Sequence, residues 1–448
     1  MNINKNRQDF YGVKPDRTTK EVAKILSWLV AAILVLLPFH ALLTTWAGSN
    51  FGHLDTWRVW KEILFLLMLP PAAWLVWHSP VLKKWLVNSW IMRLFAVYIF
   101  LHLVLGIWAY ANHEVNKTAL VYSLIVNLRF IGFFILCFIV AAYSDFLRRH
   151  WRKILLLPAG IVILFGLVQK FLLPYDFLRH FGYGSSTIPA YQTVDANLDY
   201  RRIQSILRGA NPLGAYLVLV IPALGVGAKK SRILRLGVTL AGLLALLFSY
   251  SRSAWLGLVA AAATLRAMTL RTLNIGYRMV MVIIALLILV GVGIYLTNKS
   301  EEAQNVLFHT SDDSASARSS NADRLASLET GAKDVIHQPL GRGPGTAGPA
   351  SFRNDQPPRI AENYFLQIGQ EVGVIGIALF VAINVLVARE LWARRKDQLA
   401  KVLLASLIGL TFVNLLSHAW TDDTISYLWW GLAGIALTPI LKCSGKKQ

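Results

Sequence analysis

Four short segments of the sequence carry arginines or a carboxylate that could act on a phosphorylated substrate. Arg202 and Arg208 precede one apolar run, Arg252 lies in a tight turn between two others, and Glu362 begins a further one. Arginine stays protonated and binds phosphate through paired hydrogen bonds. A carboxylate can accept the proton of an attacking hydroxyl group. These residue types suit transfer from a diphosphate lipid, with arginines neutralising the leaving group so that no metal is required.

The fourth segment is rich in glycine and lies between the turn arginine and the carboxylate. It reads Pro339-Leu-Gly-Arg-Gly-Pro-Gly, and its Gly343 and Gly345 would let the backbone pass close to a ligand. The sequence contains no phosphate-binding P-loop, dinucleotide fingerprint, HExxH or CxxC motif. We therefore predict neither a cofactor nor a metal site.

The elements that must position these residues are membrane-spanning helices. The 448 residues are 55% apolar and only 15% charged, whereas soluble domains carry about 25% charged residues. Solid apolar runs also differ from the alternating segments of a membrane barrel. Taking about 20 apolar residues per span, we expect twelve, at 25–46, 62–78, 91–111, 118–143, 154–174, 213–228, 236–250, 254–270, 279–297, 363–388, 402–418 and 425–441. The prediction is an all-α polytopic protein with one membrane domain, residues 1–448.

The basic residues predict the orientation of these spans. With both termini in the cytoplasm, the inside segments hold 28 of the 45 lysines and arginines, as the positive-inside rule requires. The formal charge of +21 is then mainly an orientation signal. Nucleic acid is not an expected partner, because no basic stretch with interleaved aromatics lies on a soluble domain. Membrane lipids are the expected surroundings.

Two outside segments are longer than connectors need to be, and such loops are usually functional. They are residues 175–212 and the large loop 298–362, which precedes the tenth span. Within the large loop we expect a helix over 322–336, capped by Asn321 or Asp323. All four chemically interesting segments then lie at the outer membrane boundary.

Each of these residues also has a structural interpretation. Loop arginines could contact lipid headgroups, Arg252 could brace its turn, and Glu362 could be a first-turn acid at a helix start. Arg129, inside an expected span, could be functional or could pair with a neighbouring helix. For His337 and His418 we favour a structural role.

Taken in order, the segments resemble the O-antigen ligase and O-antigen polymerase superfamily of bacterial inner-membrane glycan enzymes. Arg202, followed by Asn211-Pro-Leu-Gly, resembles the family's arginine and Asn/Pro segment ahead of a span. Arg252, within Ser-Arg-Ser-Ala, resembles its turn arginine. The resemblance covers about residues 200–389, and the first five spans match only in hydropathy.

The large loop and its exit carry the rest of the resemblance. Arg324, followed by Pro339-Leu-Gly-Arg-Gly-Pro-Gly, resembles the family's pattern in the large periplasmic loop. Glu362-Asn363, followed by two spaced glycines, resembles the signature at the end of that loop. Ligases that join O-antigen to lipid A core usually carry histidine at the position of Glu362. Polymerases are among the members that look similar with glutamate there.

The resemblance implies a GT-C-like, inverting, metal-independent membrane glycosyltransferase with its site facing the periplasm. Its donor would be an undecaprenyl-diphosphate-linked glycan, and its acceptor another glycan, lipid A core or another surface molecule. Arg202 and Arg252 would hold the diphosphate, and Glu362 would take the acceptor proton. The large loop would close over the site and exclude water. The implied substrate-binding residues are Arg208, Arg324, Asn363, Gly343 and Gly345, with Asn363 orienting Glu362 or binding a sugar hydroxyl.

Two other classes of function compete with this one. A transporter or flippase of lipid-linked sugars would show internal pseudo-repeats and paired broken helices, and the sequence shows neither. A non-catalytic membrane scaffold would leave the grouping of arginines with a carboxylate unexplained.

Overall fold

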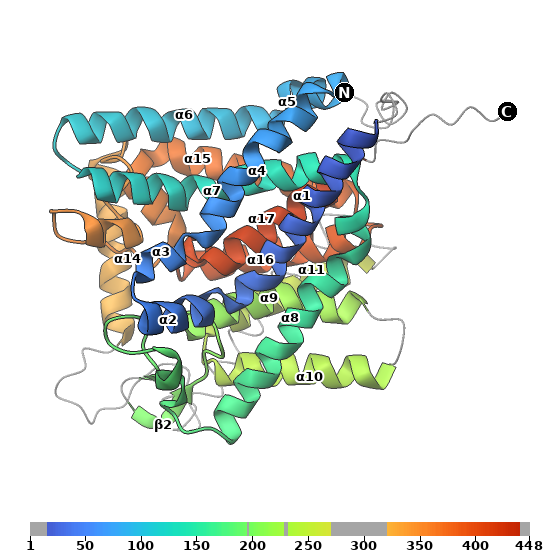
Figure 1. The fold of residues 1–448 in the computed structure, drawn as a ribbon. Helices are drawn as coiled ribbons and strands as arrows, with labels where there is room; N and C mark the ends of the chain where they lie inside the picture. Colours follow the sequence, from blue (N-terminus) through green and yellow to red (C-terminus); the bar gives the residue numbers. More distant parts are fainter. Residues whose placement is uncertain (1–15, 195–196, 228–231, 270–319, 440–448) are drawn as a thin grey trace.

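Helices form nearly all of the structure, a computed structural model that describes residues 16–194, 197–227, 232–269 and 320–439 (Figure 1). In the first half of the chain the helices are α1 (Arg17–Leu36), α2 (His40–Phe51), α3 (Leu54–Arg58), α4 (Trp60–Trp77), α5 (Pro80–Asn88), α6 (Trp90–Ala111), α7 (Lys117–Tyr143) and α8 (Phe146–Phe171). In the second half they are α9 (Ala210–Gly227), α10 (Arg232–Phe248), α11 (Arg252–Thr269), α14 (Ser320–His337), α15 (Tyr364–Ala393), α16 (Gln398–Leu415) and α17 (Asp423–Leu437).

Short elements complete the described chain. They are the 3-10 turns η2 (Leu37–Phe39), η3 (Phe177–Phe181), η4 (Gly348–Arg353) and η5 (Ala419–Thr421), and the strands β1 (Gln192–Val194) and β2 (Asn197–Arg202). The two strands pair antiparallel, with Gln192 opposite Arg202. The loop expected over 175–212 therefore contains a small hairpin, which holds Arg202 at its end.

Seven described segments are long and apolar enough to cross a membrane: Arg17–Phe51, α4, α6, α7, α8, α15 and α16. Helices α9 and α10 are apolar but shorter, and α11 and α17 also coincide with expected spans. The expected span 279–297 lies outside the described residues. The all-α membrane architecture is thus found as expected, whereas the number twelve and the GT-C-like arrangement stay predictions.

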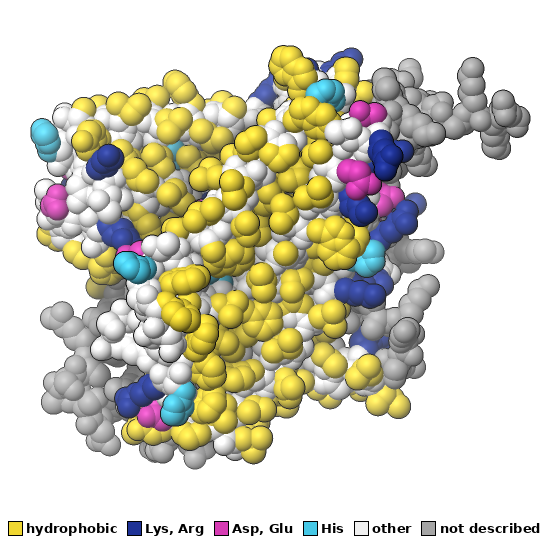
Figure 2. Space-filling model, viewed as in Figure 1, with side chains coloured by type: hydrophobic (Ala, Val, Ile, Leu, Met, Phe, Trp, Pro, Cys, Tyr) yellow, Lys and Arg dark blue, Asp and Glu magenta, His cyan; other side chains and the backbone are white. Residues whose placement is uncertain are grey.

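The surface of the bundle is suited to lipid. Large apolar side chains point outward along α4, α6 and α8, and Leu67, Phe100 and Leu157 are each 67% exposed. In Figure 2 such side chains form a broad band, while the charged side chains gather toward its two ends. Soluble monomers rarely expose apolar patches of this size. The band is the surface that acyl chains would cover.

The two ends of the bundle are built from different elements. At one end, the Tyr143 hydroxyl at the close of α7 donates to Leu75 O of α4 at 2.6 Å. Arg148 at the start of α8 donates to Thr438 O, just past α17, also at 2.6 Å. Figure 1 shows α14, α2, α3 and the hairpin at the opposite end, where α14 stands across the bundle. The expected helix 322–336 is confirmed there as part of α14, but α14 begins at Ser320, so the expected caps Asn321 and Asp323 lie inside the helix.

Small residues let the central helices approach one another closely, which is how helices in membranes commonly pack. Helix α17 lies along α7, and α11 lies along α16. A side chain at Gly434 of α17 would collide with the carbonyl oxygen of Phe134 in α7. Between α11 and α16, a Cβ at Gly257 would lie 2.7 Å from Gly409 O. The second half of the chain is thereby packed directly onto the first.

Gly434→Val should therefore destabilise the protein. The new side chain meets backbone rather than a flexible neighbour, and overpacking typically costs about 1–3 kcal/mol. Gly160→Val in α8 is the matched control, because a Cβ there meets nothing within 4 Å. Thermal unfolding in detergent should show a lower Tm for Gly434→Val alone. Equal Tm values for the two variants would contradict this packing.

Candidate functional site

Glu362 lies directly before α15, and the structure brings it together with Arg324 of α14. The Arg324 Nε donates to Glu362 Oε2 at 2.5 Å. The two side chains are 27% and 38% exposed, so the pair is open to a reactant rather than buried. A carboxylate oxygen can accept the proton of an attacking hydroxyl group. This joins two residues that the sequence placed 38 positions apart.

Asn363 fixes the main chain next to this pair. Its Oδ1 accepts from the backbone N–H groups of Phe365 and Leu366 at 2.9 and 3.0 Å, as in a helix N-cap. Its Nδ2 donates to Leu415 O at 2.9 Å. The start of α15 is therefore docked on the end of α16. Capping accounts for the asparagine, and its predicted role toward Glu362 or a sugar stays a prediction.

His418 and Arg208 approach the same pair from two further elements. Burial lowers the pKa of His418 from its usual value of 6.5; the charge of Glu362 opposes this, and those of Arg208 and Arg324 reinforce it. His418 is thus neutral at neutral pH. The structural role that the sequence favours for this histidine stays a prediction. His418 follows the end of α16 at Leu415.

Arg202 holds a second group of predicted residues together. Its Nε donates to Ser249 O at 2.9 Å, and its terminal nitrogen donates to Asn211 Oδ1 at 2.6 Å. The next residue, Ile203, donates its N–H to Phe248 O at 3.0 Å. The hairpin end, the start of α9 and the turn before α11 are therefore joined through one guanidinium. This explains the Asn/Pro segment, because Asn211 orients Arg202.

The turn before Arg252 is tight, as expected. Tyr250 has a positive φ of 49°, which is costly for a residue with a side chain. A Cβ at Gly214 of α9 would lie 2.7 Å from Ala254, so small residues let α9 approach the start of α11. Arg252 is the first residue of α11, where backbone N–H groups and the helix dipole favour an anion.

The two groups adjoin at the start of α9. Arg208 acts on His418, Asn211 binds Arg202, and three residues of chain span at most about 10 Å. Glu362, Arg324, Arg208, Arg202 and Arg252 thus lie at the same end of the bundle. Of the predicted arginines, Arg324 is seen to bind Glu362 directly in the described ranges.

The glycine-rich segment packs closely against α6 and the start of α7, whereas its sequence suggests contact with a ligand. Gly343 and Gly345 have φ values of +97° and +96°, which favour glycine. A side chain at Gly343 would collide with Ala109 of α6, and a Cβ at Gly345 would lie 2.7 Å from Val115 before α7. Close packing against these helices accounts for both glycines. Their predicted contact with a ligand stays a prediction.

Sequence reasoning missed the residue that locks this segment in place. Glu371 in α15 is 1% exposed and accepts from Ser123 Oγ at 2.9 Å, from Asn127 Nδ2 at 2.6 Å and from Gly345 N at 2.7 Å. The helix bends directly afterwards, at Val372 and Gly373. Glu371 therefore ties α7, the glycine-rich segment and the bend of α15 together. A carboxylate inside an apolar run was the signal for it.

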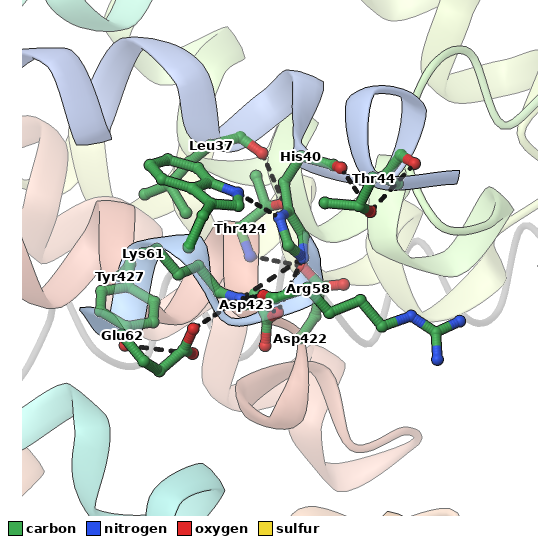
Figure 3. A network of polar contacts seen from close by, with 12 residues as sticks. Leu37, His40, Thr44, Arg58, Lys61, Glu62, Asp422, Asp423, Thr424 and Tyr427 are labelled. Atoms are coloured by element: carbon green, nitrogen blue, oxygen red, sulfur yellow. Dashed lines mark hydrogen bonds and ion pairs between the residues drawn. The ribbon is translucent and has the colours of Figure 1, made fainter. Parts of the chain in front are cut away.

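A buried ion cluster supports the same end of the bundle from within (Figure 3). Asp423, at the start of α17, binds Arg129 of α7, Lys61 of α4 at 2.9 Å and His40 of α2 at 3.3 Å. Lys61 also pairs with Glu62 at 3.2 Å, and its side chain is 2% exposed. Arg129 therefore pairs with a neighbouring helix, the structural alternative for this residue. The cluster fixes the end of the loop that carries His418.

Removing one member of this cluster should destabilise the protein strongly. Lys61→Met removes the cation that pairs with Glu62 and with Oδ2 of Asp423. Removing one partner of a buried ion pair costs about 3–5 kcal/mol. Lys24→Met is the matched control, since its pair with Glu21 has side chains 67% and 60% exposed and is worth about 1 kcal/mol or less. Tm values in detergent should fall for Lys61→Met only. An unchanged Tm for Lys61→Met would show that the cluster does not support the fold.

Comparison with known families adds an independent observation. Residues 237–381 match the model of the O-antigen ligase family. This range includes Arg252, Arg324, Gly343, Glu362 and Asn363 and confirms the resemblance seen in the sequence. No curated protein matches the chain. Across the described part of the chain, no three His, Cys, Asp or Glu side chains gather as a metal site would require.

Proposed function

We propose that this chain, whose residues 237–381 match the O-antigen ligase family, is a membrane glycosyltransferase. It would transfer or polymerise an undecaprenyl-diphosphate-linked glycan at the periplasmic face of the bacterial inner membrane. The observation that carries the proposal is the open Glu362–Arg324 pair, which lies within the matched region at the arginine-rich end of the bundle. Positive charge in the loops of the other end supports a cytoplasmic location for that end.

The proposed reaction is a single displacement. The acceptor hydroxyl oxygen attacks the anomeric carbon of the donor glycan while the bond from that carbon to the diphosphate oxygen breaks. The electron pair leaves with the diphosphate, and the hydroxyl proton passes to Glu362. Attack from the face opposite the leaving group inverts the anomeric configuration.

The arginines divide into two roles in this proposal. Arg202 and Arg252 bind the departing diphosphate, and the N-terminus of α11 adds backbone donors. Arg324 holds one oxygen of Glu362 and leaves the other to face the acceptor. Arg208, between the two groups, contributes positive charge to both. No step in this scheme requires a metal, because guanidinium groups neutralise the leaving charge.

The acceptor distinguishes two versions of the enzyme. A polymerase would join lipid-linked repeat units to one another. A ligase would move a finished glycan to lipid A core or another surface molecule. Glutamate at position 362 suits either version, because a carboxylate serves as a general base for sugar hydroxyls.

Glu362→Gln should abolish glycan transfer, because the amide cannot accept the proton; general-base catalysis contributes about 10²–10⁴-fold in rate. Glu329→Gln is the matched control, since Glu329 lies on exposed α14 surface and pairs with Lys333. The readout is the glycan profile of cells carrying each variant. Single repeat units on surface acceptors would identify a polymerase, and long chains retained on the lipid carrier would identify a ligase. A normal profile from folded Glu362→Gln would refute the base assignment.

Arg252→Lys should also impair transfer severely, since a point charge does not replace a planar guanidinium on a diphosphate. Arg266→Lys, in the last turn of the same helix, provides the control. Initial rates at varied donor concentration should show the loss for Arg252→Lys alone. Full activity of that variant would mean that Arg252 only braces its turn.

A further inference from the structure

We infer that His418 binds the acceptor sugar next to Glu362 and selects which hydroxyl reaches the carboxylate. The inference rests on the proposed glycosyl transfer and deepens it, because it assigns a residue to the acceptor side of the site. The ligand class is a polyhydroxylated sugar without charge at the reacting end.

The main chain around His418 is held against the chain around Glu362. The Tyr364 N–H donates to Ser417 O at 3.2 Å, and Asn363 Nδ2 donates to Leu415 O at 2.9 Å. Two hydrogen bonds therefore join the start of α15 to the chain that follows α16. Glu362 lies directly before the first of these segments, and His418 lies directly after the second. The two side chains emerge from neighbouring points of one docked junction.

The loop that carries His418 is also fixed at its far side. Trp420 N–H donates to Asn414 Oδ1 at 3.0 Å, and the Thr421 hydroxyl donates to His418 O at 2.7 Å. Asp422 then caps α17, accepting from Thr424 N–H at 3.0 Å. These restraints hold the main chain at His418 in a defined position, which binding of a specific hydroxyl requires.

The ring of His418 differs in its hydrogen bonding from the other described histidines that are partly or fully buried. In the described chain, the other partly or fully buried histidines have ring partners: His40 in the ion cluster, and His102 and His150 through carbonyls one helical turn back. Across the same ranges, no hydrogen bond to the His418 ring is found, although this side chain is itself partly buried. Unlike His102 Nε2, which is enclosed without a partner, the His418 nitrogens are not fully enclosed, so the ring is available to a ligand.

The charges around His418 define what that ligand can be. Three charged groups act on it, namely Glu362 before α15, Arg208 before α9 and Arg324 on α14. Burial lowers the pKa of His418, so the imidazole is neutral and has one donor and one acceptor nitrogen. A neutral ring that Arg208 and Arg324 both influence suits a hydroxyl group rather than a phosphate. The arginines retain the anion-binding role.

Because Arg324 binds one oxygen of Glu362, the acceptor hydroxyl must be oriented toward the other oxygen for its proton to be accepted. A sugar presents several similar hydroxyls. If the imidazole binds one of them, the neighbouring hydroxyl is directed to the remaining Glu362 oxygen. His418 is therefore a positioning residue for the acceptor, while Glu362 accepts the proton.

The test uses the purified full chain in liposomes, a lipid-linked glycan as donor and a defined glycan acceptor. His418→Ala should raise the acceptor KM about tenfold, the loss of roughly one hydrogen bond, and leave the donor KM unchanged. His418→Gln should recover most of the acceptor affinity, because an amide also donates and accepts. His337→Gln, an exposed histidine at the end of α14, should behave as wild type.

The pH dependence provides a second readout. Because the pKa of His418 is lowered from 6.5, the wild-type acceptor KM should stay constant through neutral pH and rise only on acidification below that value. Protonation removes the acceptor nitrogen and adds a charge beside Arg208 and Arg324. In His418→Gln this rise should be absent.

Two results would overturn the inference. One is an unchanged acceptor KM in both His418 variants. The other is an equal change in donor and acceptor KM together with a lower Tm, which would indicate a structural role. The proposed function fails separately: an active Glu362→Gln refutes the base, whereas an inactive Glu362→Gln with normal His418 variants refutes only the role of His418.

Discussion

Charge inside a membrane protein must be bound by another group of the protein, because acyl chains cannot solvate it. The cluster on Asp423 shows how this constraint shapes the molecule. Arg129, Lys61 and His40 reach one carboxylate from three helices. That carboxylate starts α17, so the cluster fixes the loop that precedes it and the position of His418.

Burial separates the structural charges from those assigned to chemistry. Lys61 is 2% exposed and Glu371 is 1% exposed, and each has partners that hold helices together. Arg324 and Glu362 are 27% and 38% exposed and can meet a substrate. Both kinds of group lie at one end of the bundle, so rigid packing directly supports the open pair. A site built in this way holds its carboxylate and arginines in place before substrate arrives.

The sequence was sufficient for features that depend on local pattern. Apolar runs predicted the helices, and the large-loop helix was found as part of α14. The family resemblance singled out Arg324 and Glu362 separately, whereas their ion pair is seen only in the structure. The contacts of Asp423 and Glu371 could not be predicted, because they join residues such as Arg129 and Asp423 that are 294 positions apart. Periodicity carries no information about such pairs.

For Gly343 and His418 too, the local sequence does not reveal which part of the structure the residue contacts. A glycine is required both where backbone passes a ligand and where it packs on a helix, and Gly343 packs on α6. A histidine after a span gives no local sign of what it faces. Only the docking of α15 on α16 places His418 beside Glu362.

The most direct test of the account is the reaction of the purified protein with an undecaprenyl-diphosphate-linked glycan and an acceptor, in the presence of a metal chelator. The account predicts release of undecaprenyl diphosphate in equal amount to new glycosidic bonds, with the anomeric configuration inverted in the product. Loss of activity with the chelator, or a product with retained configuration, would contradict a single displacement driven by arginines and Glu362. Release of no diphosphate at all would contradict glycosyl transfer itself.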